Sequence, residues 1–173
     1  MRFQQEYALS EYDAAVLTQS KHLAELFEET ARISETPKKV ANWFTGEVFR
    51  QIKHKELAAE DVTFTPRHLA DLIVAVEHKE ISQTNAKEVF EKIMDENVEP
   101  LAYMKQAGLT IVTDDNAVEA AVDEVLKGNQ KVVEEYLGGK EKVLGFLVGN
   151  VMKTMKGKAD ATKVSELIKE KIK

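Results

Sequence analysis

The residues of this chain with the clearest chemical potential are lysines near its C-terminal end. Lys153, Lys156 and Lys158 follow an apolar stretch of helical spacing, and Lys140 and Lys142 precede it. Ammonium groups grouped in this way suit the phosphate oxygens of a nucleic acid, which supply affinity without reading base sequence. Cations near the end of a helix also meet the negative end of its dipole, so a solvated face with a structural role is the alternative.

The distribution of charge is compatible with phosphate binding, although a solvated lysine-rich face is the more common explanation of such a segment. The chain has a net charge of −6, which taken alone argues weakly against a nucleic-acid partner. Residues 140–173 nevertheless hold nine lysines and four acidic residues, a net of +5, whereas residues 1–139 hold 15 basic and 26 acidic residues, a net of −11. This asymmetry predicts an acidic body and a basic terminal element that can meet a phosphate backbone.

Two glycines lie one helical turn apart inside the apolar stretch. Gly145 and Gly149 each cost about 1 kcal/mol relative to alanine in a helix interior, so we expect a compensating contact from another backbone or from a ligand. We predict close packing or close backbone approach there, with Gly149→Leu more disruptive to the C-terminal bundle than Gly138→Ala. Gly157 is expected to end the helix as the residue just beyond its cap.

Side chains that could perform catalysis or bind a metal ion show no suitable grouping. The chain lacks cysteine. Its histidines lack a metal-ligand spacing such as His-Glu-x-x-His; they are His22, His54, His68 and His78. The adjacent carboxylates of Asp114-Asp115 and Glu134-Glu135 would not face each other on a helix. Gly138-Gly139-Lys140 lacks the spacing of an ATP-binding loop. We therefore predict no catalytic residue, no metal site and no cofactor in this chain.

The elements that would position these residues are nearly all helices. Helix-start signals, usually a capping side chain or a proline in the first turn, occur at Ser10, Thr36-Pro37, Thr65-Pro66, Ser82, Glu99-Pro100, Asp114, Asn129 and Asp160. Apolar residues recur at helical spacing behind these signals, which predicts an all-α fold of roughly nine to ten helices.

One break divides this helical chain. Residues 109–113, Leu-Thr-Ile-Val-Thr, form the only strand-like run, and the run is too short and isolated to indicate a sheet. We interpret it as a linker between a helical domain, residues 1–108, and a small C-terminal helical bundle, residues 114–173. A domain of about 60 residues has a marginal core by itself, so tight packing at the glycines would matter there.

Three motifs resemble one known family over essentially the whole chain. They are Leu144-Gly-Phe-Leu-Val-Gly-Asn-Val-Met-Lys153 with Lys156-Gly-Lys-Ala-Asp160, Glu6-Tyr-Ala-Leu-Ser-Glu-Tyr-Asp-Ala14 with Leu17-Thr18, and Ala41-Asn-Trp-Phe44. Together they resemble the C-terminal region of the B subunit of the tRNA-dependent amidotransferase, a helical domain followed by a YqeY-like tail. The chain would then start in the middle of that subunit, with Met1 an introduced start.

The resemblance has three small departures, none at a catalytic group. Ala8 stands where the family usually has glycine, Asn150 where it often has glutamine, and Asp160-Ala161 where Asn-Pro is common. The family converts Glu-tRNA(Gln) or Asp-tRNA(Asn) to the amidated form. The resemblance implies that ATP and a divalent metal act in the N-terminal part of the subunit, outside this chain.

The resemblance also implies partners and a role. Ammonia would come from the amidase subunit, a small third subunit would complete the enzyme, and the helical and tail domains would grip tRNA. Lys153, Lys156 and Lys158, with Lys140 and Lys142 as weaker candidates, would contact the tRNA backbone. The alternative is a subunit-interaction or structural module without tRNA contact. No apolar run approaches the roughly 18 residues of a membrane span, so we expect a cytoplasmic protein without a membrane partner.

Overall fold

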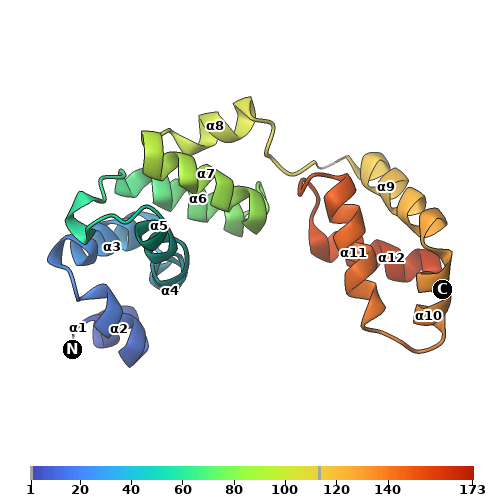
Figure 1. The fold of residues 1–173 in the computed structure, drawn as a ribbon, viewed down its shortest axis with the longest axis horizontal. Coiled ribbons are helices and arrows are strands. Elements are labelled where there is room, and N and C mark those ends of the chain that lie inside the picture. The colour runs from blue at the N-terminus through green and yellow to red at the C-terminus, as the bar shows by residue number, and fades with distance from the viewer. Residues whose placement is uncertain (1, 113) are drawn as a thin grey trace. The chain divides into compact units, whose positions relative to one another are not determined.

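The computed structural model describes residues 2–112 and 114–173, and these residues form helices joined by short connections (Figure 1). The helices are α1 (Arg2–Tyr7), α2 (Glu11–Leu17), α3 (Lys21–Ser34), α4 (Pro37–Trp43), α5 (Phe49–His54), α6 (Pro66–Glu77), α7 (Gln83–Glu96), α8 (Pro100–Gln106), α9 (Asp115–Gly128), α10 (Gln130–Leu137), α11 (Val143–Thr154) and α12 (Ala161–Ile172). A π-helical turn, Phe44–Val48, joins α4 to α5, and Ala59–Asp61 forms a 3-10 turn. The described residues contain no strand, and the predicted all-α class is confirmed.

The capping signals explain several of the helix starts. The side chains of Ser10, Asp114 and Asp160 each accept a hydrogen bond of 2.9–3.0 Å from a backbone N–H of the first turn, as N-caps do. Asn129 occupies the predicted N-cap position of α10, but its side chain makes no capping hydrogen bond to the first turn of that helix. Its side-chain amide donates instead to the carbonyl of Val125, 2.8 Å away. The backbone N–H of Asn129 donates to the carbonyl of Leu126. The carbonyl of Val125, at the end of α9, therefore accepts a hydrogen bond from the side chain instead of from the backbone.

The chain divides into two compact units. The first comprises Met1–His78 and Ala86–Ala107, and the second comprises Lys79–Asn85 and Gly108–Lys173. The domain limits expected from the sequence, 1–108 and 114–173, stay a prediction. No sequence pattern indicates that the segment leading into α7 packs with the C-terminal helices.

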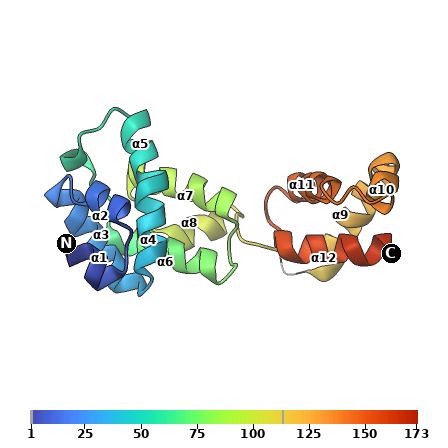
Figure 2. The same cartoon turned by 90° about the horizontal axis from the view of Figure 1, so that it is seen from below.

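The core of the first unit is a chain of aromatic rings. Phe27, Phe44, Phe64 and Phe90 follow one another edge-to-face, with ring centroids 5.8–6.2 Å apart, and Trp43 meets Phe90 at 5.6 Å. Such pairs add about 0.5–1.5 kcal/mol each to the hydrophobic effect. These rings are buried in the first unit, in which α3 packs against α4 and α6 (Figure 2).

The core of the second unit is aliphatic and is arranged around α11. This helix packs against α9, α10 and α12 (Figures 1 and 2). The buried residues, drawn from α9, α11, α12 and the turn before α12, are Val118, Ala121, Val122, Val125, Leu147, Val151, Ala159, Val164, Ile168 and Ile172. Small branched side chains of this kind interdigitate closely, so the unit holds α11 in a fixed orientation about its own axis.

The expected linker is hydrogen-bonded within the second unit. The N–H of Ile111 donates to the carbonyl of Glu80 at 2.8 Å, and the N–H of Val112 donates to that of Lys158 at 2.6 Å. Thr110 forms an isolated antiparallel bridge with Ile81. Residues 110–112 therefore form single backbone pairings, as an extended segment can, but they do not form a sheet. Thr113 lies outside the described residues.

Candidate nucleic-acid interface

The sequence of α11 gives the helix one buried and one exposed face. Leu147 and Val151 have no exposed surface, because the neighbouring helices of the second unit cover them. Lys142, Gly145, Phe146, Gly149 and Lys153 are all exposed, and their spacing of three and four residues places them on one side of the helix. We call these five residues the exposed face of α11.

The glycines of this face do not pack against the rest of the chain. Apart from its two chain neighbours and the nearby backbone of α11, a Cβ added to Gly145 or Gly149 would meet no atom of the described residues within 4 Å. The prediction that another part of the fold packs closely there is wrong, because the packed side of α11 is the Leu147 side and both glycines point away from it. The expected disruption by Gly149→Leu loses its basis for the same reason. Solvent or a ligand is left as the neighbour of both glycines.

The end of α11 differs from the expectation at Gly157. Lys156 is the first left-handed residue beyond the helix, with φ of 51°, and Gly157 follows with φ of 71°. The N–H of Gly157 donates to the carbonyl of Met152 at 2.7 Å, the outer hydrogen bond of a Schellman motif. Gly157 therefore occupies the position after the one predicted, and a lysine bears the unfavourable left-handed conformation. The close approach expected at Gly157 is present: an added Cβ would lie 2.8 Å from Oδ1 of Asn85.

The lysines of the second unit differ in whether they form ion pairs. Lys79 and Lys171 form ion pairs of 2.6 and 2.8 Å with Asp160 and Asp123, and Lys163 is paired with Asp115. Within residues 2–112 and 114–173, no ion pair involves Lys142, Lys153, Lys156 or Lys158. These four cations have no carboxylate to release before they bind an anion.

The predicted lysines are not equivalent in the structure. Lys140 is paired with Glu135 at 3.1 Å. The ammonium of Lys158 lies 3.5 Å from where a Cβ on Gly108 would stand, and the side chain is partly buried. Lys153 and Lys156 are exposed, the first in the last turn of α11 and the second just beyond it. Lys153 and Lys156 are therefore the most accessible candidates for contacting an anion near the end of α11. Lys142 is the accessible candidate at the opposite end of the helix.

Phe146 was not singled out from the sequence, although its position outside the apolar stripe of α11 could have indicated it. The residue is 55% exposed, whereas phenylalanine is among the residue types most often buried. The apolar stripe of α11 contains residues 143, 144, 147, 148, 151 and 152, and position 146 falls outside it by helical spacing. A large apolar residue off the stripe is the kind of feature that marks a binding surface.

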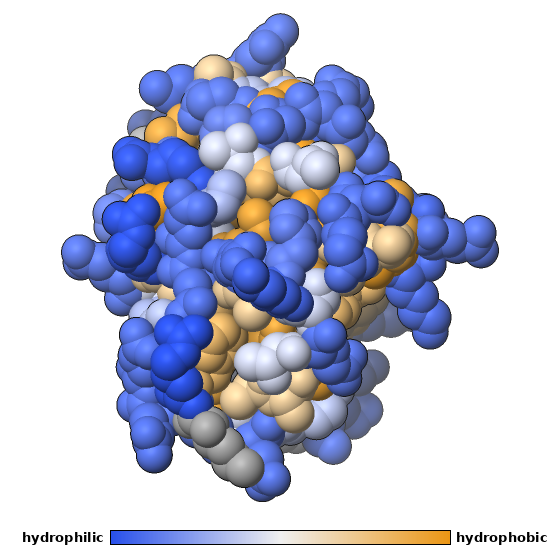
Figure 3. Space-filling model, turned by 90° about the vertical axis from the view of Figure 1, so that its left-hand side faces the viewer, coloured by the Kyte–Doolittle hydropathy of each residue, from blue (hydrophilic) through white to orange (hydrophobic). Residues whose placement is uncertain are grey.

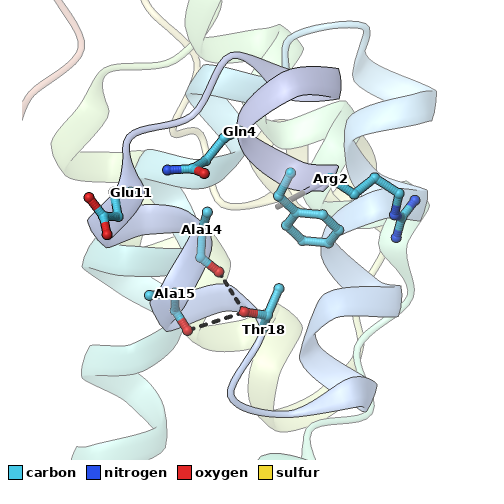
Figure 4. A pocket seen from close by; sticks show the side chains of 7 residues that line it. Arg2, Gln4, Glu11, Ala14, Ala15 and Thr18 are labelled. Carbon is cyan, nitrogen blue, oxygen red and sulfur yellow. Dashed lines mark hydrogen bonds between the residues drawn. The ribbon is translucent and has the colours of Figure 1, made fainter.

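A hollow in the first unit offers no catalytic arrangement. It has a volume of about 440 Å³, lies among the residues of α1 and α2 (Figure 4), and is lined by Arg2, Phe3, Gln4, Glu11, Ala14, Ala15 and Thr18. The hydroxyl of Thr18 already donates to the carbonyls of Ala14 and Ala15, at 2.7 and 3.3 Å.

The face of the first unit seen in Figure 3 is mainly hydrophilic, with apolar side chains showing between the polar ones.

Metal-binding clusters and membrane-spanning helices are both missing from the part of the chain that the structure describes. No group of three or more His, Asp or Glu side chains in that part is placed to hold a metal ion. None of the helices that these residues form is long and apolar enough to cross a membrane.

Comparison with known families decides where the chain belongs. The family described as the GatB domain matches residues 25–172, which includes α11, the lysines that follow it and most of the first unit. The chain belongs to the GatB domain family. The match covers well over half of the chain, so both units fall within one family.

Individual relatives of this GatB-domain chain agree with one another. It is 42% identical over 98% of its length to the B subunit of the aspartyl/glutamyl-tRNA(Asn/Gln) amidotransferase of Lachnoclostridium phytofermentans. It is 44% and 46% identical, over 99% of its length, to the proteins of the same name from Lachnospira eligens and Trichlorobacter lovleyi. The matched region is 36–37% of each relative, so the chain spans about a third of their length.

Proposed function

We propose that this chain is the tRNA-binding C-terminal part of the B subunit of a glutamine- and ATP-dependent amidotransferase. The enzyme would convert Glu-tRNA(Gln) or Asp-tRNA(Asn) to Gln-tRNA(Gln) or Asn-tRNA(Asn). Membership of the GatB domain family supports this proposal, as do relatives named for that activity that match 98–99% of the chain.

One observation carries the tRNA-binding role of this part. Lys142, Lys153 and Lys156 lie exposed at the two ends of α11 and form no ion pair with any residue that the structure describes, in a terminal segment whose net charge is +5. Unpaired cations gain the most from phosphate contacts, because binding releases the counterions of the nucleic acid at no cost in lost ion pairs.

Within this proposal the chain grips substrate and does not perform the chemistry. ATP and a divalent metal would act in the remainder of the B subunit, ammonia would come from the amidase subunit, and a small third subunit would complete the enzyme. We predict that the purified chain shows no ATPase, glutaminase or transamidation activity. Assays with ATP, glutamine and Glu-tRNA(Gln) check this, and ATP-dependent amidation by the chain alone would contradict it.

The binding role is tested by titrating the chain against transcribed tRNA(Gln) in gel-shift assays at two salt concentrations. We expect binding that weakens steeply as salt rises, as phosphate contacts require. Absence of binding at low salt, with the helical content of the chain intact by circular dichroism, would contradict the proposal. That result would favour the alternative of a subunit-interaction module without tRNA contact.

A further inference from the structure

Phe146 is a large apolar residue that is 55% exposed on α11. Among the described residues, the exposed large apolar side chains are Tyr12, Leu101, Leu137 and Phe146. Burying a phenylalanine is favourable by roughly 1.5–3 kcal/mol, so its position on the outer side of α11 forgoes that gain. The ring is therefore placed where a partner can cover it.

The residues around this ring define the partner's chemistry. Gly145 directly precedes Phe146 and Gly149 follows one turn later, and open space lies over both. The ring thus stands beside helix backbone that lacks side chains, which leaves room for a flat group to approach. Lys142 lies one turn before Phe146 and Lys153 two turns after it, both exposed and both on the same side of the helix.

A protein partner and a nucleic acid make different demands on such a surface. A protein groove for a helix needs several apolar anchors, one on each turn. The exposed face of α11 has a single ring with cations on either side of it. Single-stranded nucleic acid requires an aromatic ring for base stacking and cations for the adjoining phosphates. The two flanking cations complement the charge of RNA, so RNA is the occupant that this surface fits.

We propose that Phe146 stacks on an unpaired base of the bound tRNA while Lys142 and Lys153 contact phosphates on either side of it. This inference rests on the proposed tRNA-binding function. It further specifies that the bound part of the RNA contains an unpaired base. Bases inside an A-form duplex are covered by their neighbours, so only a loop, bulge or end presents a free base. The two lysines are separated by about 16 Å along the axis at 1.5 Å per residue, which accommodates a short stretch of RNA backbone.

The test compares variants of the full chain for their Kd toward transcribed tRNA(Gln). Stacking lost on substitution by alanine weakens binding by about 5- to 150-fold, so Phe146→Ala should fall in this range. Phe146→Leu should retain little of the affinity, and Phe146→Tyr should retain most of it. Leu137→Ala is the matched control, since Leu137 is 63% exposed in the same unit, and it should bind like the parent. An equal loss in Leu137→Ala would contradict a specific stacking contact.

Salt dependence and fluorescence give readouts that a merely structural role would not change. Phe146→Ala removes no charge, so the slope of log Kd against log salt should stay at the parent value. Phe146→Trp should show fluorescence quenching when a single-stranded oligoribonucleotide is added, and much less with a fully paired RNA duplex. Trp43 is 6% exposed and supplies a constant background.

The outcomes separate this inference from the proposed function. A parent chain that binds no tRNA at low salt overturns the proposed function. A parent that binds tRNA, loses affinity on charge reversal at Lys153 and Lys156, and keeps its affinity in Phe146→Ala overturns only the stacking contact. Equal quenching of Phe146→Trp by duplex and single-stranded RNA would also overturn it.

Discussion

The side chain of Asn85 lies directly against the backbone of Gly157. Its amide nitrogen is 3.4 Å from the carbonyl oxygens of both Leu109 and Lys156, and its oxygen would be 2.8 Å from a Cβ at Gly157. Asn85 is itself buried, so it joins the first turn of α7, the residues after α8 and the end of α11. This contact fixes the turn that presents Lys156.

Replacing the glycines of the second unit should have opposite effects on its stability. Gly157→Ala places a Cβ against Asn85 at a φ of 71°, and the left-handed conformation alone costs roughly 1–2 kcal/mol for a non-glycine residue. Gly149→Ala meets open space and should stabilise the helix by up to about 1 kcal/mol. Amide hydrogen exchange in α11 and α12 measures both changes separately from the first unit. Greater protection in Gly157→Ala than in Gly149→Ala would contradict this assignment.

Replacing Ala8 by glycine should increase the stability of the first unit. The φ of 51° at this position places alanine in the left-handed region at a cost of roughly 1–2 kcal/mol, and glycine would avoid that cost while losing part of the gain to its greater freedom when unfolded. We expect Ala8→Gly to raise the stability of the first unit slightly, by at most about 1 kcal/mol. Thermal unfolding of the chain measures this. Ala15→Gly, in the middle of α2, is the control and should be destabilising; a loss of stability in Ala8→Gly as well would contradict the prediction.

Asp160 should make the stability of the second unit depend on pH. The ion pair with Lys79 holds the pKa of this carboxyl below its ordinary value; burial opposes that shift, and backbone N–H groups of Thr162 and Lys163 assist it. Because the folded pKa is depressed, the stabilisation is full above the unfolded pKa of about 4 and is lost as pH falls through the lower folded value. Urea unfolding at pH 7 and pH 3 measures this loss.

Two substitutions separate the charge of Asp160 from its cap. Asp160→Ala should cost about 1 kcal/mol through loss of the N-cap of α12. Asp160→Asn should keep most of the cap, since asparagine caps about as well as aspartate, and should flatten the pH dependence. A pH dependence in Asp160→Asn as steep as that of the parent would show that other groups are responsible.

The sequence predicted the fold class and the buried side of α11, because apolar residues at helical spacing report directly which side of a helix is covered. It did not predict what lies over Gly145 and Gly149, because a glycine leaves the same pattern whether a backbone or open space faces it. The contact of Asn85 with Gly157 joins residues more than seventy positions apart, and no local pattern encodes such a pairing. Lys156 is a candidate cation by sequence, but the sequence pattern places the first left-handed residue at the neighbouring glycine.

The most direct test of a phosphate-binding lysine surface is the salt dependence of tRNA affinity in Lys153→Glu/Lys156→Glu. These two positions are preferred to Lys158, whose ammonium lies close to Gly108. The matched control is Lys38→Glu/Lys53→Glu, which makes the same charge change at exposed positions in the first unit. We predict that the first variant keeps its helical content, binds tRNA(Gln) more weakly, and flattens the slope of log Kd against log salt by about two units, while the control retains the parent slope. Equal affinity and slope in both variants would contradict a phosphate-binding role for these lysines.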